Sequence, residues 1–257
     1  MTLLENLRDE ACARAADCTI ADVRIGLGYT AVQLDNGSVG LAYTFRENAG
    51  KGCSVFQGRR PLASAAVRDI VHYIASSDML ERTVGLAAAN ALFNTVDAAC
   101  TCADWLCTEG DLLDVLELTK DDRVGMVGFF GPLAPVIRQR AAELIVFEEH
   151  MDRADGLTPG ARAAELLPTC TVAIITATSI INNSFEQLAA AASSCRAIAM
   201  LGPSTPLVPA LFRGYGVTHL SGILAENQQQ IMRVVSEGGG TRNFMKWSKK
   251  INLITKS

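Results

Sequence analysis

The sequence predicts an α/β protein in which an α+β domain precedes a doubly wound parallel sheet. From about residue 122 onward, short apolar runs alternate with helical segments, and parallel strands need crossover helices of this kind. The first hundred residues instead suggest a helix, two β runs and two further helices. Residues 124–148 resemble the strand, glycine turn, helix and strand that open a nucleotide-binding unit.

In the first half, apolar residues recur at helical spacing over residues 3–16. Two runs rich in β-branched and aromatic residues, 22–34 and 39–45, flank an Asn-Gly pair, which predicts a hairpin. Helices are expected over 62–75 and 79–94. Because the second of these is small and apolar, we expect its neighbours to approach closely.

We expect a first domain at 1–100, a connection at 101–121 and a second domain at 122–257. The predicted strands of the second domain are 123–128, 143–147, 171–175, 197–201 and 217–221. The predicted helices lie near 133–141, 160–167, 184–192, 206–213 and 226–237. The basic tail after residue 240 also carries aromatic residues, so we expect it to pack against the body of the protein.

The composition describes a globular chain of 257 residues, 49% hydrophobic and 19% charged. A net charge of −4 gives no basic surface for nucleic acid. The chain shows no signal peptide, and no apolar run approaches the ~20 residues needed to cross a bilayer. Eight cysteines without an export signal are expected as thiols. We therefore expect a cytoplasmic protein whose partner is a small molecule, and self-association into a homo-oligomer stays open.

The glycine turn after the first predicted strand is the clearest ligand-binding signal. Gly125, Gly128 and Gly131 give the pattern GxxGxxG rather than GxGxxG. Glu148 follows the central glycine by about 20 residues, the spacing of an acid that binds ribose hydroxyls. On this interpretation Glu148→Gln weakens a diol-bearing ligand and barely changes folding. The alternative, that Glu148 only caps a helix or pairs with a basic residue, stays open.

Polar residues also follow two later strands, where ligands lie in a doubly wound sheet. After the strand at 171–175 come Thr176, Thr178, Asn182 and Ser184, and helix capping explains one of them but not four. The next strand ends in Gly202-Pro203-Ser204-Thr205-Pro206. There Thr205 suits an N-cap, and the exposed amides of the helix start would attract an anion. Simple turn chemistry is the alternative for this second group.

The loop after residue 45 resembles a phosphate-binding loop only superficially. A P-loop needs glycine where Phe45 stands and Ser or Thr where Gly52 stands, so ATP hydrolysis is rejected. The loop could still close over a ligand, with Glu47 as general acid–base, unless Glu47 is simply solvated.

Cysteines supply the metal-binding candidates. The spacing Cys100-x-Cys102-x4-Cys107 could hold a soft metal, because thiolates are preferred ligands of such metals. A closed zinc site needs four ligands, however, and the nearest histidine in sequence is His72. Cys53 is a further candidate. His150 and His219 follow or adjoin predicted strand ends and are weaker site candidates.

The whole chain resembles the heavy-metal chelation family of bacteria and archaea. The matching stretches are Gly85 to Ala91, Val124 to Pro132, Ile180 to Glu186, Gly202 to Leu207, and Gly216 to Gly222. The resemblance implies an enolase N-terminal-like domain followed by a Rossmann-like domain, with a cleft between them and a partial likeness to methyltransferases. It also implies chemistry on pterin-, flavin- or siderophore-like metal chelators.

The resemblance and the motifs together define the expected site. Its catalytic residues would be Glu47, Asn48 and Asn90. Its ligand-binding residues would be Gly128, Gly131, Pro132, Glu148, Thr176, Thr178, Asn182, Ser184, Gly202, Ser204 and Thr205. A nucleotide or S-adenosylmethionine-like ligand, a metal ion or a metal chelate would occupy it. The leading hypothesis is an enzyme acting on such a small molecule. The alternative is a non-catalytic protein that sequesters or delivers metal through Cys53, Cys100, Cys102 or Cys107, or that holds a metal chelate.

Overall fold

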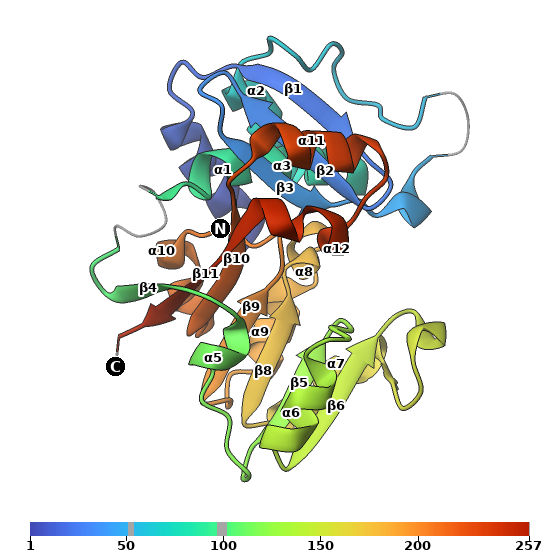
Figure 1. Ribbon diagram of the computed structural model, residues 1–257, viewed down its shortest axis with the longest axis vertical. Coiled ribbons are helices and arrows are strands. Elements are labelled where there is room, and N and C mark those ends of the chain that lie inside the picture. The colour runs from blue at the N-terminus through green and yellow to red at the C-terminus, as the bar shows by residue number, and fades with distance from the viewer. Residues whose placement is uncertain (51–53, 97–101, 257) are drawn as a thin grey trace.

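The computed structural model describes residues 1–50, 54–96 and 102–256 and contains two separate sheets (Figure 1). The small sheet has three antiparallel strands, β1 (Ile20–Ile25), β2 (Tyr29–Leu34) and β3 (Val39–Tyr43). The large sheet has eight strands and is mostly parallel. The expected α/β class with an α+β first half is confirmed. No helix within the described ranges is long and apolar enough to cross a membrane.

The small sheet differs in one respect from the prediction of two β runs. The hairpin between β2 and β3 forms as expected, and its turn uses Gly37 at a φ of +88°. The first run, however, divides into β1 and β2, which flank a turn closed by the Gly26 N–H donating to the Tyr29 carbonyl. The sheet is therefore a three-stranded meander.

Three helices lie on one side of the small sheet, with the third packed directly on its strands and the other two packed against the third. They are α1 (Leu3–Arg14), α2 (Val67–Val71) continued by η2 (His72–Ala75), and α3 (Met79–Phe93). The second helix begins later than residue 62, because the segment before it is extended, bridging Ala66 to Thr19 and pairing Ala65 with Ile20.

Helix α3 is almost entirely buried, as its small apolar residues predict. Its neighbours approach its backbone directly. A Cβ on Gly40 of β3 would stand 2.1 Å from the Ala87 carbonyl oxygen and from the Ala91 nitrogen. A Cβ on Gly85 would stand 2.5 Å from the Ile74 nitrogen. Glycine at these two positions lets β3 and η2 touch the helix.

Six strands of the large sheet are parallel. They are β5 (Arg123–Val127), β6 (Glu143–Glu148), β7 (Thr158–Pro159), β8 (Val172–Thr176), β9 (Ala197–Leu201) and β10 (His219–Ala225). Five of them match the predicted β/α alternation, and the short β7 was not predicted. In space the order of the six strands is β7-β6-β5-β8-β9-β10, so the order of strands along the chain reverses between β5 and β8. Doubly wound sheets bind ligands beyond the carboxyl ends of the strands at such a switch point.

Two antiparallel strands extend this sheet and were not expected. β11 (Ser248–Thr255) pairs with β10, and β4 (Trp105–Glu109) pairs with β11. The expected connection at 101–121 therefore contributes an edge strand, and the end of the basic tail joins the body of the protein as a strand of the large sheet. Three consecutive residues of β11 are buried, the apolar Ile251 and Leu253 and the polar Asn252 between them.

Helices cover both faces of the large sheet. α5 (Leu112–Val115) and α6 (Ala134–Arg140) pack on one face through a core that includes Leu112, Ile137 and Met126. On the other face lie α7 (Ala163–Leu166), α9 (Phe185–Ala191) and α10 (Pro209–Phe212), and this core continues into the first domain. Between β8 and α9 a short helix, α8 (Thr178–Ile181), carries several of the polar residues singled out above. The 3-10 turns are η1 (Arg46–Asn48), η3 (Met151–Arg153), η4 (Gly160–Arg162), η5 (Leu167–Thr169), η6 (Arg213–Tyr215) and η7 (Met245–Trp247).

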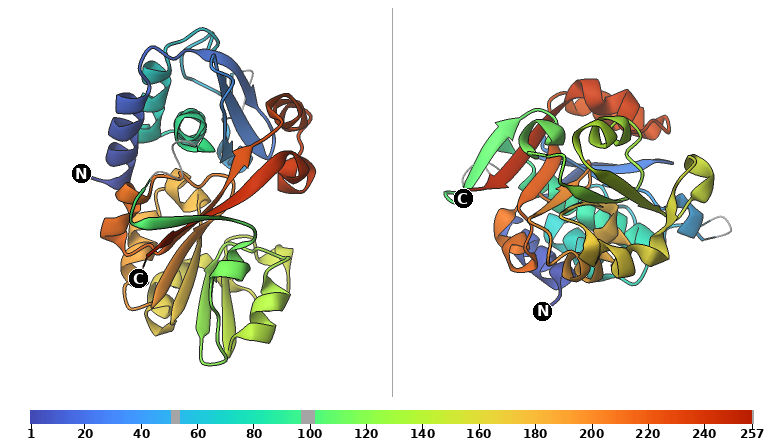
Figure 2. Two further views of the ribbon diagram at one scale, coloured as in Figure 1. Left: turned by 60° about the vertical axis from the view of Figure 1, so that its left-hand side comes forward. Right: turned by 90° about the horizontal axis from the view of Figure 1, so that it is seen from below.

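The chain returns to the first domain near its end. α11 (Gln228–Ser236) and α12 (Thr241–Phe244) lie on the face of the small sheet opposite α3 (Figure 2). Ile231, Val235 and Phe244 pack there against Ala31 and Leu41. The small sheet is thus covered on both faces, with one cover supplied by residues far along the chain.

One ion pair, between a buried carboxylate and a half-exposed arginine, joins the amino ends of three parallel strands and yields a stability prediction. The Asp122 carboxylate accepts hydrogen bonds from Arg196 Nε (3.0 Å) and Nη2 (2.6 Å), from the Thr119 N–H and from the Thr171 hydroxyl. The Arg196 guanidinium holds the pKa of Asp122 well below its usual range. Asp122→Asn should lower the free energy of unfolding at pH 7 by about 2–3 kcal/mol, because bonds to charged groups are lost.

This contribution has a defined pH window. A carboxyl whose pKa is lower in the folded than in the unfolded protein stabilises the fold at pH values above its unfolded-state pKa, which is about 4. That stabilisation is lost as the pH falls toward the folded-state pKa. Urea unfolding should therefore separate variant and parent at pH 7, and the difference should shrink progressively as the pH falls below about 4. Asp121→Asn, at the exposed neighbouring position, is the control and should match the parent. Equal stability of Asp122→Asn and parent at pH 7 would contradict this role.

Candidate functional site

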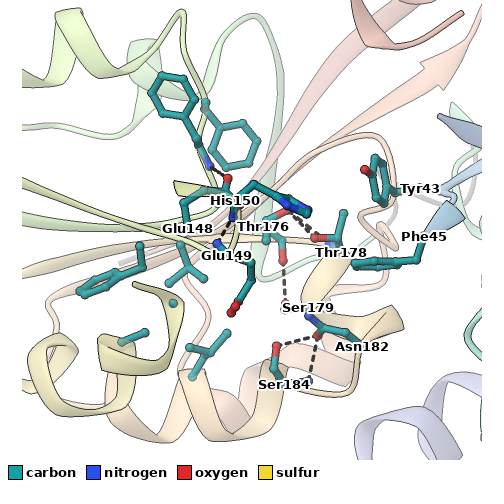
Figure 3. A pocket seen from close by; sticks show the side chains of 18 of the residues that line it. Tyr43, Phe45, Glu148, Glu149, His150, Thr176, Thr178, Ser179, Asn182 and Ser184 are labelled. Carbon is teal, nitrogen blue, oxygen red and sulfur yellow. Dashed lines mark hydrogen bonds between the residues drawn. The ribbon is translucent and has the colours of Figure 1, made fainter. Parts of the chain in front are cut away.

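A cavity of about 510 Å³ lies at the switch point of the large sheet, between the strand ends and the small sheet (Figure 3). From the large sheet it is bordered by the carboxyl ends of β5, β6 and β8. From the first domain it is bordered by β2, β3 and the turn that follows β3. Residues chosen from the sequence that line it are Glu47, Gly128, Glu148, Thr176, Thr178, Asn182 and Ser184. Residues from both halves of the chain therefore meet in one pocket.

The glycine turn after β5 borders this pocket. Gly128 has a φ of +88°, and a Cβ there would stand 3.1 Å from Cβ of Thr176, so both conformation and space favour glycine. Gly131 is different, since its φ is not positive and the nearest atom to a Cβ would be an edge carbon of Phe129 at 3.6 Å. Gly131 and Pro132 do not line the cavity.

Glu148 ends β6 with its carboxylate directed into the turn. Oε2 accepts from the Phe129 N–H (3.0 Å), and Oε1 accepts from the N–H groups of Glu149 (2.9 Å) and His150 (3.2 Å). The residue is 6% exposed. Glu148 thus braces the glycine turn against the end of β6, a structural role that differs from the helix capping considered for it in the sequence. Glu148→Gln would place an amide against these donors, so a loss of folding stability is expected as well.

Hydroxyl and amide groups line the floor of the pocket at the end of β8. The Thr176 and Thr178 hydroxyl oxygens are 3.0 Å apart, and the Ser179 hydroxyl donates to the Thr176 carbonyl. Oδ1 of Asn182 accepts from the N–H and the hydroxyl of Ser184 (3.2 and 2.7 Å). These groups therefore hold one another in place at the end of β8.

An aromatic wall faces these polar groups from the first domain. The rings of Tyr29 and Tyr43 meet edge to face at 5.7 Å, and Tyr43 and Phe45 do so at 5.1 Å. The Tyr29 hydroxyl accepts from Thr241 of α12, and burial raises the pKa of Tyr29 to about 12. The Tyr29 phenol therefore stays protonated at neutral pH.

One acid and one histidine approach each other across the mouth of the pocket. Oε1 of Glu47, in η1, lies 3.7 Å from Nε2 of His150, which follows β6. Their side chains remain 40% and 48% exposed, so both are accessible to a bound molecule. Glu47 is placed as expected, and its partner is the histidine considered a weaker candidate. Asn48, next to Glu47, does not line the cavity.

The loop after β9 lies in the interface between the domains rather than in the pocket. Nδ2 of Asn90 donates to the Leu41 and Ser204 carbonyls (2.9 and 3.0 Å), and Nδ2 of Asn94 donates to the Thr205 carbonyl. Ser204 and Thr205 are 1% and 0% exposed. Helix α10 begins at Pro209, beyond the expected start, so Thr205 does not cap it. The cavity lining therefore does not include Asn90, Gly202, Ser204 or Thr205. Of these, Asn90, Ser204 and Thr205 make hydrogen bonds that connect the two domains.

The donor groups of the described chain do not form a metal site. No group of three or more His, Cys, Asp or Glu within it could hold a metal ion. Of the cysteine candidates, Cys102 is a free thiol and Cys107 is disulfide-bonded, so the expectation of eight thiols is wrong for Cys107. Cys53 and Cys100 lie outside the described residues.

Several lining residues were not chosen as site candidates from the sequence. They are Tyr29, Tyr43, Phe129, Phe130, Glu149, Gln187 and Thr241. The tyrosines looked like ordinary strand residues, and Thr241 lies more than 200 residues from the hydroxyl it contacts. Of these, Glu149 could have been found, because it is a polar residue directly after a predicted strand, next to His150, which was already a weaker candidate.

The two glycines of the turn give a matched test of this geometry. Gly128→Ala should lower the free energy of unfolding by about 1–3 kcal/mol, because alanine is strained at positive φ. Gly131→Ala should stay within about 0.5 kcal/mol of the parent, as expected for a site without such strain. Chemical unfolding of both variants checks the difference. Equal destabilisation would show that the turn does not have this conformation.

The comparisons with known proteins agree with the two-part architecture. Residues 111–254 match the DUF364 family model and residues 8–93 match the DUF4213 model, both described as "Putative heavy-metal chelation". An uncharacterised protein of Methanocaldococcus jannaschii is 25% identical over 234 residues, or 85% of each chain.

Two solved structures of DUF364-family proteins with unknown function share the fold. The one from Pyrococcus horikoshii has a TM-score of 0.85 at 22% identity and covers 99% of this chain and 100% of its own. The one from Desulfitobacterium hafniense has a TM-score of 0.78 at 22% identity, with 98% of each chain covered. At this identity they support the fold alone. With the family model spanning more than half of its length, the chain belongs to the DUF364 heavy-metal chelation family.

Proposed function

We propose that this protein binds a small organic molecule with a planar ring in the pocket between its two domains. The carrying observation is the composition of the pocket, which sets an aromatic wall from β2 and β3 against hydroxyl and amide groups at the end of β8. Ligand sites are typically concave, apolar and supplied with a few converging polar groups, and 510 Å³ is within their usual range.

Pterin- and flavin-like heterocycles suit this combination best. Their flat rings can pack against Tyr43 and Phe45, and their ring N–H and carbonyl groups can pair with the hydroxyl and amide side chains opposite. Siderophore- and S-adenosylmethionine-like molecules are also candidate ligands for the pocket, since they too combine apolar and hydrogen-bonding parts.

The family description concerns metal, and we propose that any metal is held through the organic ligand. The described residues offer no cluster of three donors, whereas the pocket has room for a chelator. Elemental analysis of protein purified without an affinity tag, before and after addition of a metal chelate, tests this. Metal should appear only with the chelate, and stoichiometric metal without it would support direct ligation instead.

Catalysis, if the protein is an enzyme, would use the Glu47–His150 pair. A carboxylate beside an imidazole at a pocket mouth can orient the ring and let it transfer a proton to or from the ligand. The non-catalytic alternative is a protein that holds or delivers a metal chelate, in which the same pair would serve only as a contact between the domains.

Calorimetric titration with pterin, riboflavin, S-adenosylmethionine and their metal complexes tests the binding proposal. Phe45→Ala should weaken the best-bound heterocycle up to about tenfold, because edge-to-face and stacking contacts contribute roughly 0.5–1.5 kcal/mol. Leu27→Ala is the control, since Leu27 belongs to the same domain, is 65% exposed and does not line the pocket. Absence of binding by every compound would contradict the proposal.

Mass spectrometry of the bound heterocycle after incubation separates the enzyme from the binding protein. An enzyme should give a changed mass, and His150→Gln should slow that change at least tenfold with little effect on affinity, within the usual range for a proton-transfer group. His72→Gln, at an exposed histidine outside the pocket, should match the parent. An unchanged ligand mass with the parent protein would favour the binding protein.

A further inference from the structure

We propose that the pocket selects uncharged or cationic heteroaromatic rings and excludes their phosphorylated or carboxylated forms. This inference rests on the proposed function and narrows its ligand class. It departs from the expectation of a nucleotide, because the place where doubly wound sheets bind phosphate is occupied by the protein's own carboxylate.

The first step of the argument concerns the backbone donors of the glycine turn. In nucleotide-binding folds such donors, together with the following helix start, bind the pyrophosphate. Here the Phe129 N–H donates to buried Glu148, and the Gly128 N–H donates to the Phe147 carbonyl. A phosphate at this point would have to displace a carboxylate that is held by three backbone amides.

The second step concerns the start of α6, which offers few donors. The N–H groups of Leu133 and Ala134 both donate to the Phe130 carbonyl, at 2.9 and 3.2 Å. Pro132 and Pro135 have no N–H. Of the eight positions from 128 to 135, four donate within the protein and two cannot donate. At most the N–H groups of Phe130 and Gly131 remain for a ligand, fewer than the several converging amides of a phosphate-binding turn.

The third step concerns charge. The described residues that line the cavity include three acids, Glu47, Glu148 and Glu149, and no lysine or arginine. His150 is their one basic member, and it already lies beside Glu47. An anionic substituent would meet carboxylates of like charge, whereas amino and ring N–H groups would meet hydrogen-bond acceptors.

Glu149 is the acid whose charge an anionic ligand would meet most directly. Its side chain lies against Gly160, where a Cβ would stand 2.2 Å from Oε1, so a larger residue there would displace it. Unlike Glu148, Glu149 is exposed, and both border the cavity from the end of β6. Together they put negative charge on this wall of the pocket, opposite Tyr43 and Phe45 (Figure 3).

Two matched pairs of compounds test the inference by calorimetry at low salt. They are pterin with 6-carboxypterin, and riboflavin with its 5′-phosphate, FMN. The uncharged member of each pair should bind at least tenfold more tightly than the anionic member. If an anionic member binds as tightly or more tightly, the inference is overturned while the proposed function stands. If no member of either pair binds, and no compound of the wider titration does, the proposed function fails first and the inference falls with it.

Two variants test whether the charge of Glu149 causes the preference for the uncharged compound of each pair. Glu149→Gln should reduce the preference for the uncharged member at least threefold, by improving binding of the anion. Glu143→Gln, at the exposed opposite end of the same strand, should leave the preference unchanged. An unchanged preference in Glu149→Gln, with binding intact, would overturn the role of this carboxylate.

Discussion

Two asparagine side chains at the end of α3 hold the first domain on the large sheet, and the pocket depends on them. The side-chain amide of Asn90, in α3, donates to the Leu41 carbonyl of β3 and to the Ser204 carbonyl beyond β9. It therefore joins three parts of the chain. Asn94 binds the same loop from both sides, donating to Thr205 and accepting from the Leu207 N–H. These groups are buried, and leaving such a donor or acceptor without its partner costs about 1–3 kcal/mol.

The position of the aromatic wall follows from this contact. The Tyr43 N–H donates to the Ser204 hydroxyl, and the Thr83 hydroxyl of α3 donates to the Tyr43 carbonyl. The end of β3 is therefore fixed to both domains immediately before Phe45 and Glu47 enter the pocket. On its other side, α12 fixes Tyr29 through Thr241. The pocket is consequently a product of the domain interface rather than of either domain alone.

Much of the fold could be predicted from local sequence patterns. The five predicted strands of the second domain lie close to their observed positions, because buried parallel strands are short apolar runs with distinct ends. The small residues of 85–91 correctly predicted close packing around α3. Strands β4 and β11 were missed, since β4 pairs with a strand some 140 residues away and neither is a clear apolar run.

The residues of the candidate site likewise divide into those that the sequence could predict and those that it could not. Thr176, Thr178, Asn182 and Ser184 were predictable, because each follows a strand whose end has a known place in the sheet. Ser204, Thr205 and Asn90 are as polar and as close to element ends, but their side-chain or backbone groups bind across the interface. Sequence alone cannot distinguish a polar group that faces a ligand from one that faces another domain. The bracing role of Glu148 likewise depends on the direction of its carboxylate.

Hydrogen–deuterium exchange with and without saturating riboflavin tests most directly whether the ligand binds between the two domains. The account predicts slower exchange together in residues 43–48 of the first domain and in 127–131 and 176–184 of the second. These segments border one cavity but lie far apart in sequence. Protection restricted to one domain, or lying outside all three segments, would contradict it.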